Sequence, residues 1–353
     1  MKKKDYHILG VMSGTSLDGI DLAECFFSVS ETGTWSFKIG KTTTIAYSKN
    51  WKRRLQEAIH FSEGRLQSLN VEYTGFLGNI ISGFISENNI ENLDAVCSHG
   101  HTILHQPEKG ITLQIGNLPE IAQLTGQQVV CDFRMKDVSL GGQGAPLVPI
   151  GDQMLFKEYD YCLNLGGFAN CSFQQNGKRI AYDICPVNIV LNLLANELGF
   201  AYDDAGRLAA AGNLDNDLLE KLTALDFYMR SPPKSLGLEW VQKEVLPLLN
   251  ASTILVQDKL RTFTDHAAQE LARQFRNGGK VLVTGGGAYN TYLLDKVRDY
   301  KEVDLLVPDA ALLEYKEALV FGLLGVLRLR NEVNCLSSVT GAIEDCSGGV
   351  VFN

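Results

Sequence analysis

The sequence has 353 residues, of which 45% are hydrophobic and 21% are charged, and this balance excludes a disordered chain. The formal net charge of -9 disfavours binding to nucleic acid or to anionic membranes, because both require basic patches. No stretch approaches the roughly 20 apolar residues of a membrane span, and no signal peptide follows the basic start, so we expect a cytoplasmic protein. The eight cysteines contain no CxxC pair and are expected as buried free thiols.

The first two predicted strands, residues 7–12 and 20–28, flank a polar turn that contains glycine. Backbone N–H groups and hydroxyls in such a turn could hold phosphate oxygens, although the sequence is neither a P-loop nor GxGxxG. Asp18 and Asp21 favour this interpretation, because either could hold Mg²⁺ through a water molecule. A plain hairpin turn, with Asp21 as a surface carboxylate, is the alternative. The candidate nucleotide-binding residues here are Gly14, Thr15, Ser16, Leu17, Asp18, Gly19, Ile20 and Asp21.

Helices are predicted over residues 50–60 and 67–87, and buried strands over 93–98 and 128–133. His99 and His101, with His105 nearby, do not have the usual helical spacing of zinc ligands, and no cysteine or carboxylate completes a set. We expect these histidines to bind a polar substrate or to be satisfied within a turn. The segment 139–149, rich in glycine and proline, leads into the second half of the chain.

The second half repeats the pattern of the first, roughly 155 positions later, with strands predicted over 161–165, 168–174 and 179–182. Its turn, Gly166-Gly167, is a candidate second phosphate loop. Helices are predicted over 189–198, 215–223, 251–276 and 314–328, and a strand over 280–284. Gly285, Gly286 and Gly287 follow that strand and would allow a ligand to approach the backbone closely.

Strands alternating with helices predict an α/β protein. Two matched halves around a cleft suggest a two-domain, actin-like (ribonuclease H-like) fold with a duplicated core. We expect domains over residues 1–150 and 151–353. Asp183, at the end of the third strand of the second half, is the candidate catalytic base, although an ordinary strand-end aspartate is equally compatible with the pattern.

Several blocks closely resemble the anhydro-N-acetylmuramic acid kinase family. They cover nearly the whole chain in order, and the first and the Asp132–Pro149 blocks are highly specific. The matching segments are 10–21, 98–100, 112–116, 132–134 with 141–149, 164–170, 233–235 and 285–287.

The resemblance implies an ATP- and Mg²⁺-dependent kinase of peptidoglycan recycling, with ATP in the interdomain cleft, which forms a homodimer. In the implied reaction, water opens the 1,6-anhydro ring of anhydro-N-acetylmuramic acid while O6 receives the γ-phosphate of ATP. By position, Asp183 resembles the family's base, and His99, Arg134 and Glu317 resemble sugar-binding residues. Arg134 suits the lactyl carboxylate through paired hydrogen bonds. Glu317 could instead be an exposed helix carboxylate.

Two positions depart from the family pattern. The family's Thr-Gly-Pro-Gly-Asn after the base is replaced by Ile184-Cys185-Pro186-Val187-Asn188, and Gln is replaced by His101. We expect the first change to stiffen the backbone and to bring side chains toward the sugar. A kinase for another amino sugar or sugar acid is therefore one alternative function, and a non-catalytic nucleotide or sugar sensor is another.

Overall fold

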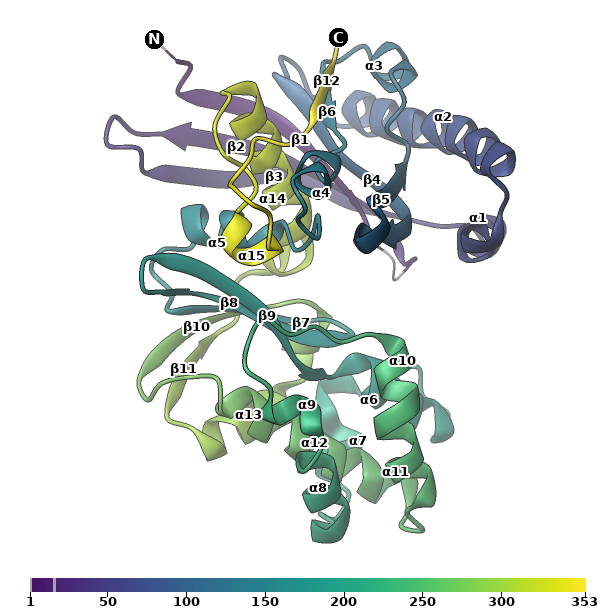
Figure 1. Cartoon of the computed structure of the whole chain (residues 1–353), viewed down its shortest axis with the longest axis vertical. Helices are drawn as coiled ribbons and strands as arrows, with labels where there is room; N and C mark the ends of the chain where they lie inside the picture. The colour runs from purple at the N-terminus through teal and green to yellow at the C-terminus, as the bar shows by residue number, and fades with distance from the viewer. Residues whose placement is uncertain (1, 15–16) are drawn as a thin grey trace. The chain divides into compact units, whose positions relative to one another are not determined.

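The computed structural model describes residues 2–14 and 17–353 and divides into two compact units (Figure 1). One unit contains the residues up to Leu155 together with Tyr315–Asn353, and the other contains Phe156–Glu314. The division differs from the expected one. The boundary predicted after residue 150 lies near Leu155, but Tyr315–Asn353, which the sequence assigned to the second domain, returns to the first unit.

The sheet of the first unit has seven strands within the described residues, ordered β12-β6-β4-β1-β2-β3, with β5 paired to β4. Strands β1 to β3 form an antiparallel meander, β4 lies parallel to β1, and β6 lies parallel to β4. The strand bounds are β1 Asp5–Ser13, β2 Gly19–Val29, β3 Trp35–Ala46, β4 Ala95–Gln106, β5 Ile111–Ile115, β6 Val129–Cys131 and β12 Val350–Phe352.

Two long helices cover the two faces of this sheet. Side chains of α2 such as Leu69 and Leu77 share a buried cluster with Leu9 and Val11 of β1. The alternate face of β1, where Gly10 lies, meets α14. The helices of this unit are α1 Lys49–Glu57, the 3₁₀ turns η1 Ala58–His60 and η2 Pro107–Lys109, α2 Glu63–Glu87, α3 Glu120–Thr125, α4 Met135–Ser139, α5 Val148–Leu155, α14 Ala310–Leu329 and α15 Ser337–Thr340. Of these, α14 begins in the other unit, before the division at Tyr315.

The sheet of the second unit repeats the same topology, with the order β11-β10-β7-β8-β9. Strands β7 to β9 form an antiparallel meander, and β10 and β11 continue from β7 in parallel. The bounds are β7 Tyr161–Leu165, β8 Phe168–Gln175, β9 Lys178–Pro186, β10 Gly279–Thr284 and β11 Val303–Leu306. A ribonuclease H-like sheet therefore occurs twice, which confirms the predicted two-domain, actin-like class. The sequence analysis missed β3, the third strand of the first meander.

The core of the second unit forms where α12 packs beside α6, α8 and α13. Phe263 and Leu271 of α12 are buried there with Leu163 of β7 and Val281 of β10. The helices of this unit are α6 Asn188–Glu197, η3 Asp204–Gly206, α7 Arg207–Ala210, α8 Asn216–Thr223, α9 Asp226–Met229, α10 Leu238–Trp240, the π turn η4 Val241–Val245, α11 Leu246–Ala251, α12 Val256–Ala272, η5 Gly286–Tyr289 and α13 Thr291–Tyr300.

All eight cysteines are buried free thiols. Within residues 2–14 and 17–353, none of the helices combines the length and the apolar character that crossing a membrane requires.

Gly10 tests how closely β1 packs on α14. A Cβ at this position would lie 2.0 Å from the carbonyl oxygen of Ala318, so backbone would have to move. We expect Gly10→Ala to lower the free energy of unfolding by about 1–3 kcal/mol in urea titrations. Gly83→Ala is the matched control. A Cβ at this α2 position meets no atom within 4 Å, and alanine should stabilise the helix by up to about 1 kcal/mol. Equal stability of Gly10→Ala and the wild type would contradict the close packing.

Candidate functional site

The predicted phosphate loop connects β1 to β2 in the first unit. Thr15 and Ser16 lie outside the described residues. Leu17 is buried and has a left-handed backbone with φ 60°, an uncommon conformation for leucine that surrounding structure must maintain. Gly19 is required by packing, because a Cβ there would lie 2.6 Å from the carbonyl oxygen of Ile45 on β3. At Gly19, therefore, the glycine of the motif is needed for the packing of β2 against β3.

The two acidic residues near this loop have different surroundings. Asp18 is exposed to solvent, whereas Asp21 is half-buried on β2 and accepts a hydrogen bond of 2.7 Å from the hydroxyl of Thr44. Carboxylate oxygens are suitable partners for Mg²⁺ or its bound water. Both residues therefore fit the expected role, and Asp18 has the more accessible carboxylate.

Arg134 lies at the start of α4, in contact with His99 of β4. Its Nε and Nη2 atoms lie 3.0 and 2.9 Å from Nε2 of His99, and Nη1 donates to the carbonyl oxygen of Gly144 over 2.6 Å. Since Nε2 of His99 must accept from the guanidinium, its proton is on Nδ1, which donates to the carbonyl oxygen of Gly100 over 2.9 Å. Burial, with the charge of Arg134, lowers the pKa of His99 well below its ordinary value and keeps the ring neutral.

These contacts orient a guanidinium that has two N–H groups without a partner among the residues that the structure describes. An arginine has five N–H groups, and the contacts above use one on each of the three nitrogens. The remaining two are on the adjacent terminal nitrogens of Arg134, the arrangement that pairs with a carboxylate. Burial lowers the pKa of Arg134 to about 10, opposed by the charge of Glu317, so Arg134 remains cationic at pH 7.

Of the three predicted sugar-binding residues, His99 and Arg134 are therefore in direct contact. Glu317, on α14, is exposed and lies close enough to act on Arg134 electrostatically. Both ring nitrogens of His99 are engaged within the protein, so the observed role of His99 is to hold Arg134.

Asp137 organises the neighbouring glycine-rich segment, and sequence analysis did not single it out. Its Oδ2 accepts from the backbone N–H of Gly144 over 2.7 Å, and its Oδ1 accepts from the hydroxyl of Thr340 over 2.7 Å and from the thiol of Cys335 over 3.1 Å. Asp137, Cys335 and Cys346 together place three potential metal-ligand atoms within 4.8 Å of one another. The hydrogen bonds satisfy the buried carboxylate, and they fix the carbonyl that orients Arg134, so we assign Asp137 a structural role.

In the second unit, the turn between β7 and β8 faces the glycine run after β10. A Cβ on Gly166 or Gly167 would meet other atoms only at ordinary contact distances, 3.5 and 3.7 Å. By contrast, a Cβ on Gly285 would lie 2.6 Å from the amide oxygen of Asn164, and one on Gly287 would lie 2.7 Å from Leu165.

The three consecutive glycines are therefore not equivalent. Gly285, with φ 82°, and Gly287 are needed because β10 and η5 pass close to the end of β7. A Cβ on Gly286 has no atom within 4 Å. Only Gly286 retains the predicted role of leaving space for a ligand, and packing explains the other two.

Asp183 lies on β9, opposite Asn170 of β8, and a register shift follows directly. Its backbone N–H donates to the carbonyl of Lys234 over 3.1 Å, and its Oδ2 accepts from the backbone N–H of Leu236 over 2.8 Å. Burial raises the pKa of Asp183, and the Leu236 hydrogen bond opposes this. A half-buried carboxylate with a raised pKa and one oxygen without a described hydrogen bond has the properties of a general base.

The segment after Asp183 corrects an expectation from the sequence. Ile184, Cys185 and Val187 were predicted to bring side chains toward the sugar, but each is at most 1% exposed and belongs to the hydrophobic core of the second unit. The register shift between Asp183 and Cys185 allows this inward packing. Asn188 follows, and its amide donates to the carbonyl of Leu165 over 3.3 Å.

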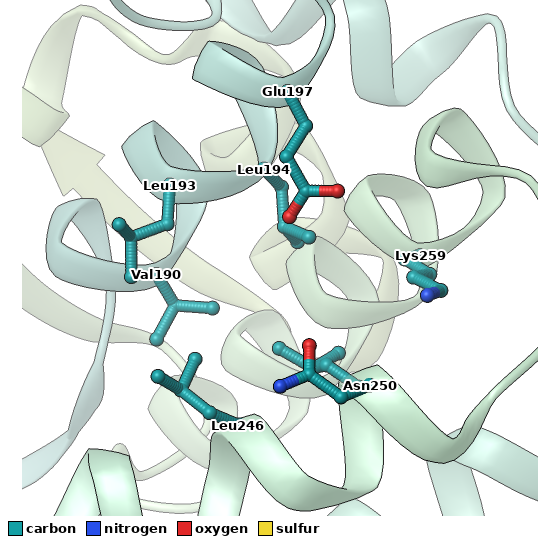
Figure 2. Close-up of a pocket in the computed structure, with 8 residues that line it drawn as sticks. Val190, Leu193, Leu194, Glu197, Leu246, Asn250 and Lys259 are labelled. Carbon is teal, nitrogen blue, oxygen red and sulfur yellow. The ribbon is translucent and has the colours of Figure 1, made fainter.

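A small cavity in the second unit lies away from these residues. Figure 2 shows it between α6, α11 and α12, with Glu197 and Lys259 among apolar side chains such as Leu194 and Leu246. Its volume of ≈ 20 Å³ suits about one water molecule and cannot hold a sugar or a nucleotide.

Residues 6–353 match the sequence profile of a family described as anhydro-N-acetylmuramic acid kinase. The chain belongs to the anhydro-N-acetylmuramic acid kinase family. A protein of that name from Methylorubrum populi is 33% identical, with 97% of this chain and 98% of the relative covered. Namesakes from Acinetobacter baylyi, 32% identical over 95% and 96%, and Mannheimia succiniciproducens, 33% identical over 99% of each, are also similar.

Among solved structures, component A of (R)-2-hydroxyglutaryl-CoA dehydratase from Acidaminococcus fermentans has a TM-score of 0.46 and 15% sequence identity. The comparison covers 91% of this chain and 97% of that one.

Nucleotide binding can be tested at Gly286, because its backbone has open space beside it whereas Gly287 is closely packed. Gly286→Ala should leave the free energy of unfolding within about 0.5 kcal/mol of the wild type, because its Cβ meets no protein atom. The same change should weaken ATP binding, measured by calorimetry, by about tenfold or more if the ligand approaches this backbone. Gly287→Ala is the comparison variant, and it should lose stability through its clash with Leu165. Wild-type ATP affinity in Gly286→Ala would place the nucleotide elsewhere.

Proposed function

We propose that this chain is an ATP-dependent kinase that opens the 1,6-anhydro ring of anhydro-N-acetylmuramic acid with water and phosphorylates O6. The products are N-acetylmuramic acid 6-phosphate and ADP. Family membership supports the reaction class, and the observation that carries the assignment is Asp183, a half-buried carboxylate with a raised pKa. We further propose a cytoplasmic location, consistent with eight free thiols, and a homodimer on the family resemblance.

The proposed reaction has a defined balance of bonds and protons. Asp183 accepts a proton from water, whose oxygen forms a bond to the anomeric carbon as the bond from that carbon to O6 breaks. O6 then bonds to the γ-phosphorus of ATP while the bond from phosphorus to the β–γ bridging oxygen breaks. Mg²⁺ bound with ATP would reduce the repulsion between phosphate charges, and the carboxylates of Asp18 or Asp21 would hold its water.

The sugar specificity is proposed to depend on Arg134. Two parallel N–H groups on adjacent nitrogens fit the lactyl carboxylate of a muramic acid, and a neutral amino sugar lacks this group. The buried side chains of Ile184, Cys185 and Val187 support the same substrate, because they are directed into the core and do not alter a sugar-binding surface. This weakens the reason to favour a different amino sugar.

The reaction can be tested with ATP, Mg²⁺ and anhydro-N-acetylmuramic acid in water enriched in ¹⁸O. We expect one ¹⁸O atom at the anomeric hydroxyl and a phosphate on O6, detected by mass spectrometry. Turnover of another sugar with none of this one would support the alternative kinase. Nucleotide binding without turnover of any sugar would support the sensor.

Asp183→Asn should lower kcat by about 10²–10⁴-fold and leave ATP affinity within about twofold of the wild type. In the wild type, a base acts only when deprotonated, so kcat/KM should decline as the pH falls through its pKa. Because burial raises that pKa, the decline should begin above the range of an ordinary aspartate, whose pKa is about 4. Full activity of Asp183→Asn would show that another group is the base.

Arg134→Lys keeps the positive charge and removes the paired donors. We expect an increase of about tenfold in KM for anhydro-N-acetylmuramic acid, with KM for ATP unchanged. The matched substrate is 1,6-anhydro-N-acetylglucosamine, which lacks the lactyl carboxylate. The variant should lose the wild-type preference for the acidic sugar. An undiminished preference would contradict the role of Arg134.

A further inference from the structure

Four buried side chains form a continuous hydrogen-bonded row that ends at the phosphate loop. The hydroxyl of Tyr73, on α2, contacts the hydroxyl of Tyr47, which lies just after β3. Tyr47 lies 2.6 Å from the hydroxyl oxygen of Ser13, and that oxygen lies 2.8 Å from Nδ1 of His101 on β4. None of the four is more than 5% exposed. They connect a helix, a strand end and two neighbouring strands.

The contacts of this row are compatible with more than one proton order, because either hydroxyl of each pair can donate. In one order, Tyr73 donates to Tyr47, Tyr47 donates to Ser13, and Ser13 donates to Nδ1 of His101. In that order His101 accepts at Nδ1 and has its proton on Nε2. Burial lowers the pKa of His101 to about 4, consistent with a neutral ring at pH 7.

Ser13 is the residue through which this row can act on function. It is the last residue of β1, it pairs with His101 in β4 and Ile20 in β2, and Gly14 follows it. The loop between the Ser13 and Ile20 strand ends contains Leu17 with its left-handed backbone. Such a conformation persists only where neighbouring structure holds it, and the Ser13 end is held by two side-chain hydrogen bonds.

A nucleophilic role for the Ser13–His101 pair does not fit the geometry. Ser13 is 2% exposed, and its oxygen already makes hydrogen bonds with the hydroxyl of Tyr47 and with Nδ1 of His101. An attacking hydroxyl needs an accessible oxygen whose lone pair is free. The same contacts suit a fixed anchor, because both the acceptor and the donor capacity of the hydroxyl are used.

We propose that His101 is a positioning residue for the phosphate loop, acting through Ser13, and that Tyr47 and Tyr73 set the tautomer in which it accepts. His101 is the position where the family pattern has glutamine, whose amide oxygen could accept the same hydrogen bond. The ligand involved, ATP, rests on the proposed function. The hydrogen-bond order of the row does not depend on that function.

The decisive variants are His101→Leu, which removes the acceptor with little change in size, and His101→Gln, which restores one. In His101→Leu the Ser13 hydroxyl is left buried without its acceptor, and we expect KM for ATP to rise about tenfold with KM for the sugar unchanged. The affinity for the ATP analogue AMPPNP, measured by calorimetry in the presence of Mg²⁺, should also fall about tenfold. His101→Gln should recover most of the loss. His60→Leu, at an exposed position on η1 and outside the row, is the control.

A second variant and a spectroscopic measurement protect the test from a folding defect. Tyr47→Phe keeps the ring and removes the hydroxyl that contacts both Ser13 and Tyr73, and it should weaken AMPPNP binding in the same direction. In ¹⁵N-histidine-labelled protein, two-bond ¹⁵N–¹H spectra should show His101 as the neutral Nε2–H tautomer, without titration above pH 5.5.

The outcomes separate this inference from the proposed function. Wild-type AMPPNP affinity in both His101→Leu and Tyr47→Phe, or equal increases in the two KM values, would overturn the positioning role. A neutral Nδ1–H tautomer would overturn the proton order. If the wild type turned over no sugar while His101→Leu still weakened AMPPNP binding, the proposed function would fail and the positioning role would stand.

Discussion

The close contact between β1 and α14 determines where the acidic side chain of Glu317 lies in the first unit. Gly10 allows the carbonyl of Ala318 to approach the strand, and the adjacent Glu317 is carried on the same helix turn. The electrostatic effect of Glu317 on Arg134 depends on this approach. A residue with a side chain at position 10 would displace the helix, so a single missing Cβ supports both the packing of the sheet and the position of an acidic group.

Two histidines separated by one residue on β4 make different contacts. His99 donates from Nδ1 and accepts from Arg134 at Nε2, whereas His101 contacts Ser13 through Nδ1. The proposed proton order gives the two rings opposite tautomers. Burial lowers the pKa of both rings, so both serve as neutral hydrogen-bonding groups. One strand thus orients the cation proposed for the sugar carboxylate and the loop proposed for the phosphates. The sequence indicated polar roles for these residues, but tautomers depend on partners from distant segments.

The sequence predicted the duplicated meanders because their strands are short, apolar and separated by glycine turns. It did not predict β3, whose residues Lys38 to Thr44 are largely polar and partly exposed. It also assigned the C-terminal segment to the wrong unit, because the periodicity of α14 identifies a buried helix without naming the sheet it covers. At the site, a motif block pointed to Arg134, and the end of the third predicted strand of the second half pointed to Asp183. The sequence could not distinguish Gly285, Gly286 and Gly287, because their roles depend on how close each lies to β7, and β7 is distant in sequence.

The backbone contacts of Asp183 connect its basicity to a segment far along the chain. The N–H of Leu236 stabilises the charged carboxylate, while burial favours the neutral acid. If residues 234–236 moved away without admitting water, the carboxylate would lose a donor and its affinity for protons would increase. The ordered conformation of residues 234–236 therefore contributes to the pKa of Asp183. Any ligand or substitution that loosens it would change the pH dependence of the proposed reaction without touching the aspartate itself.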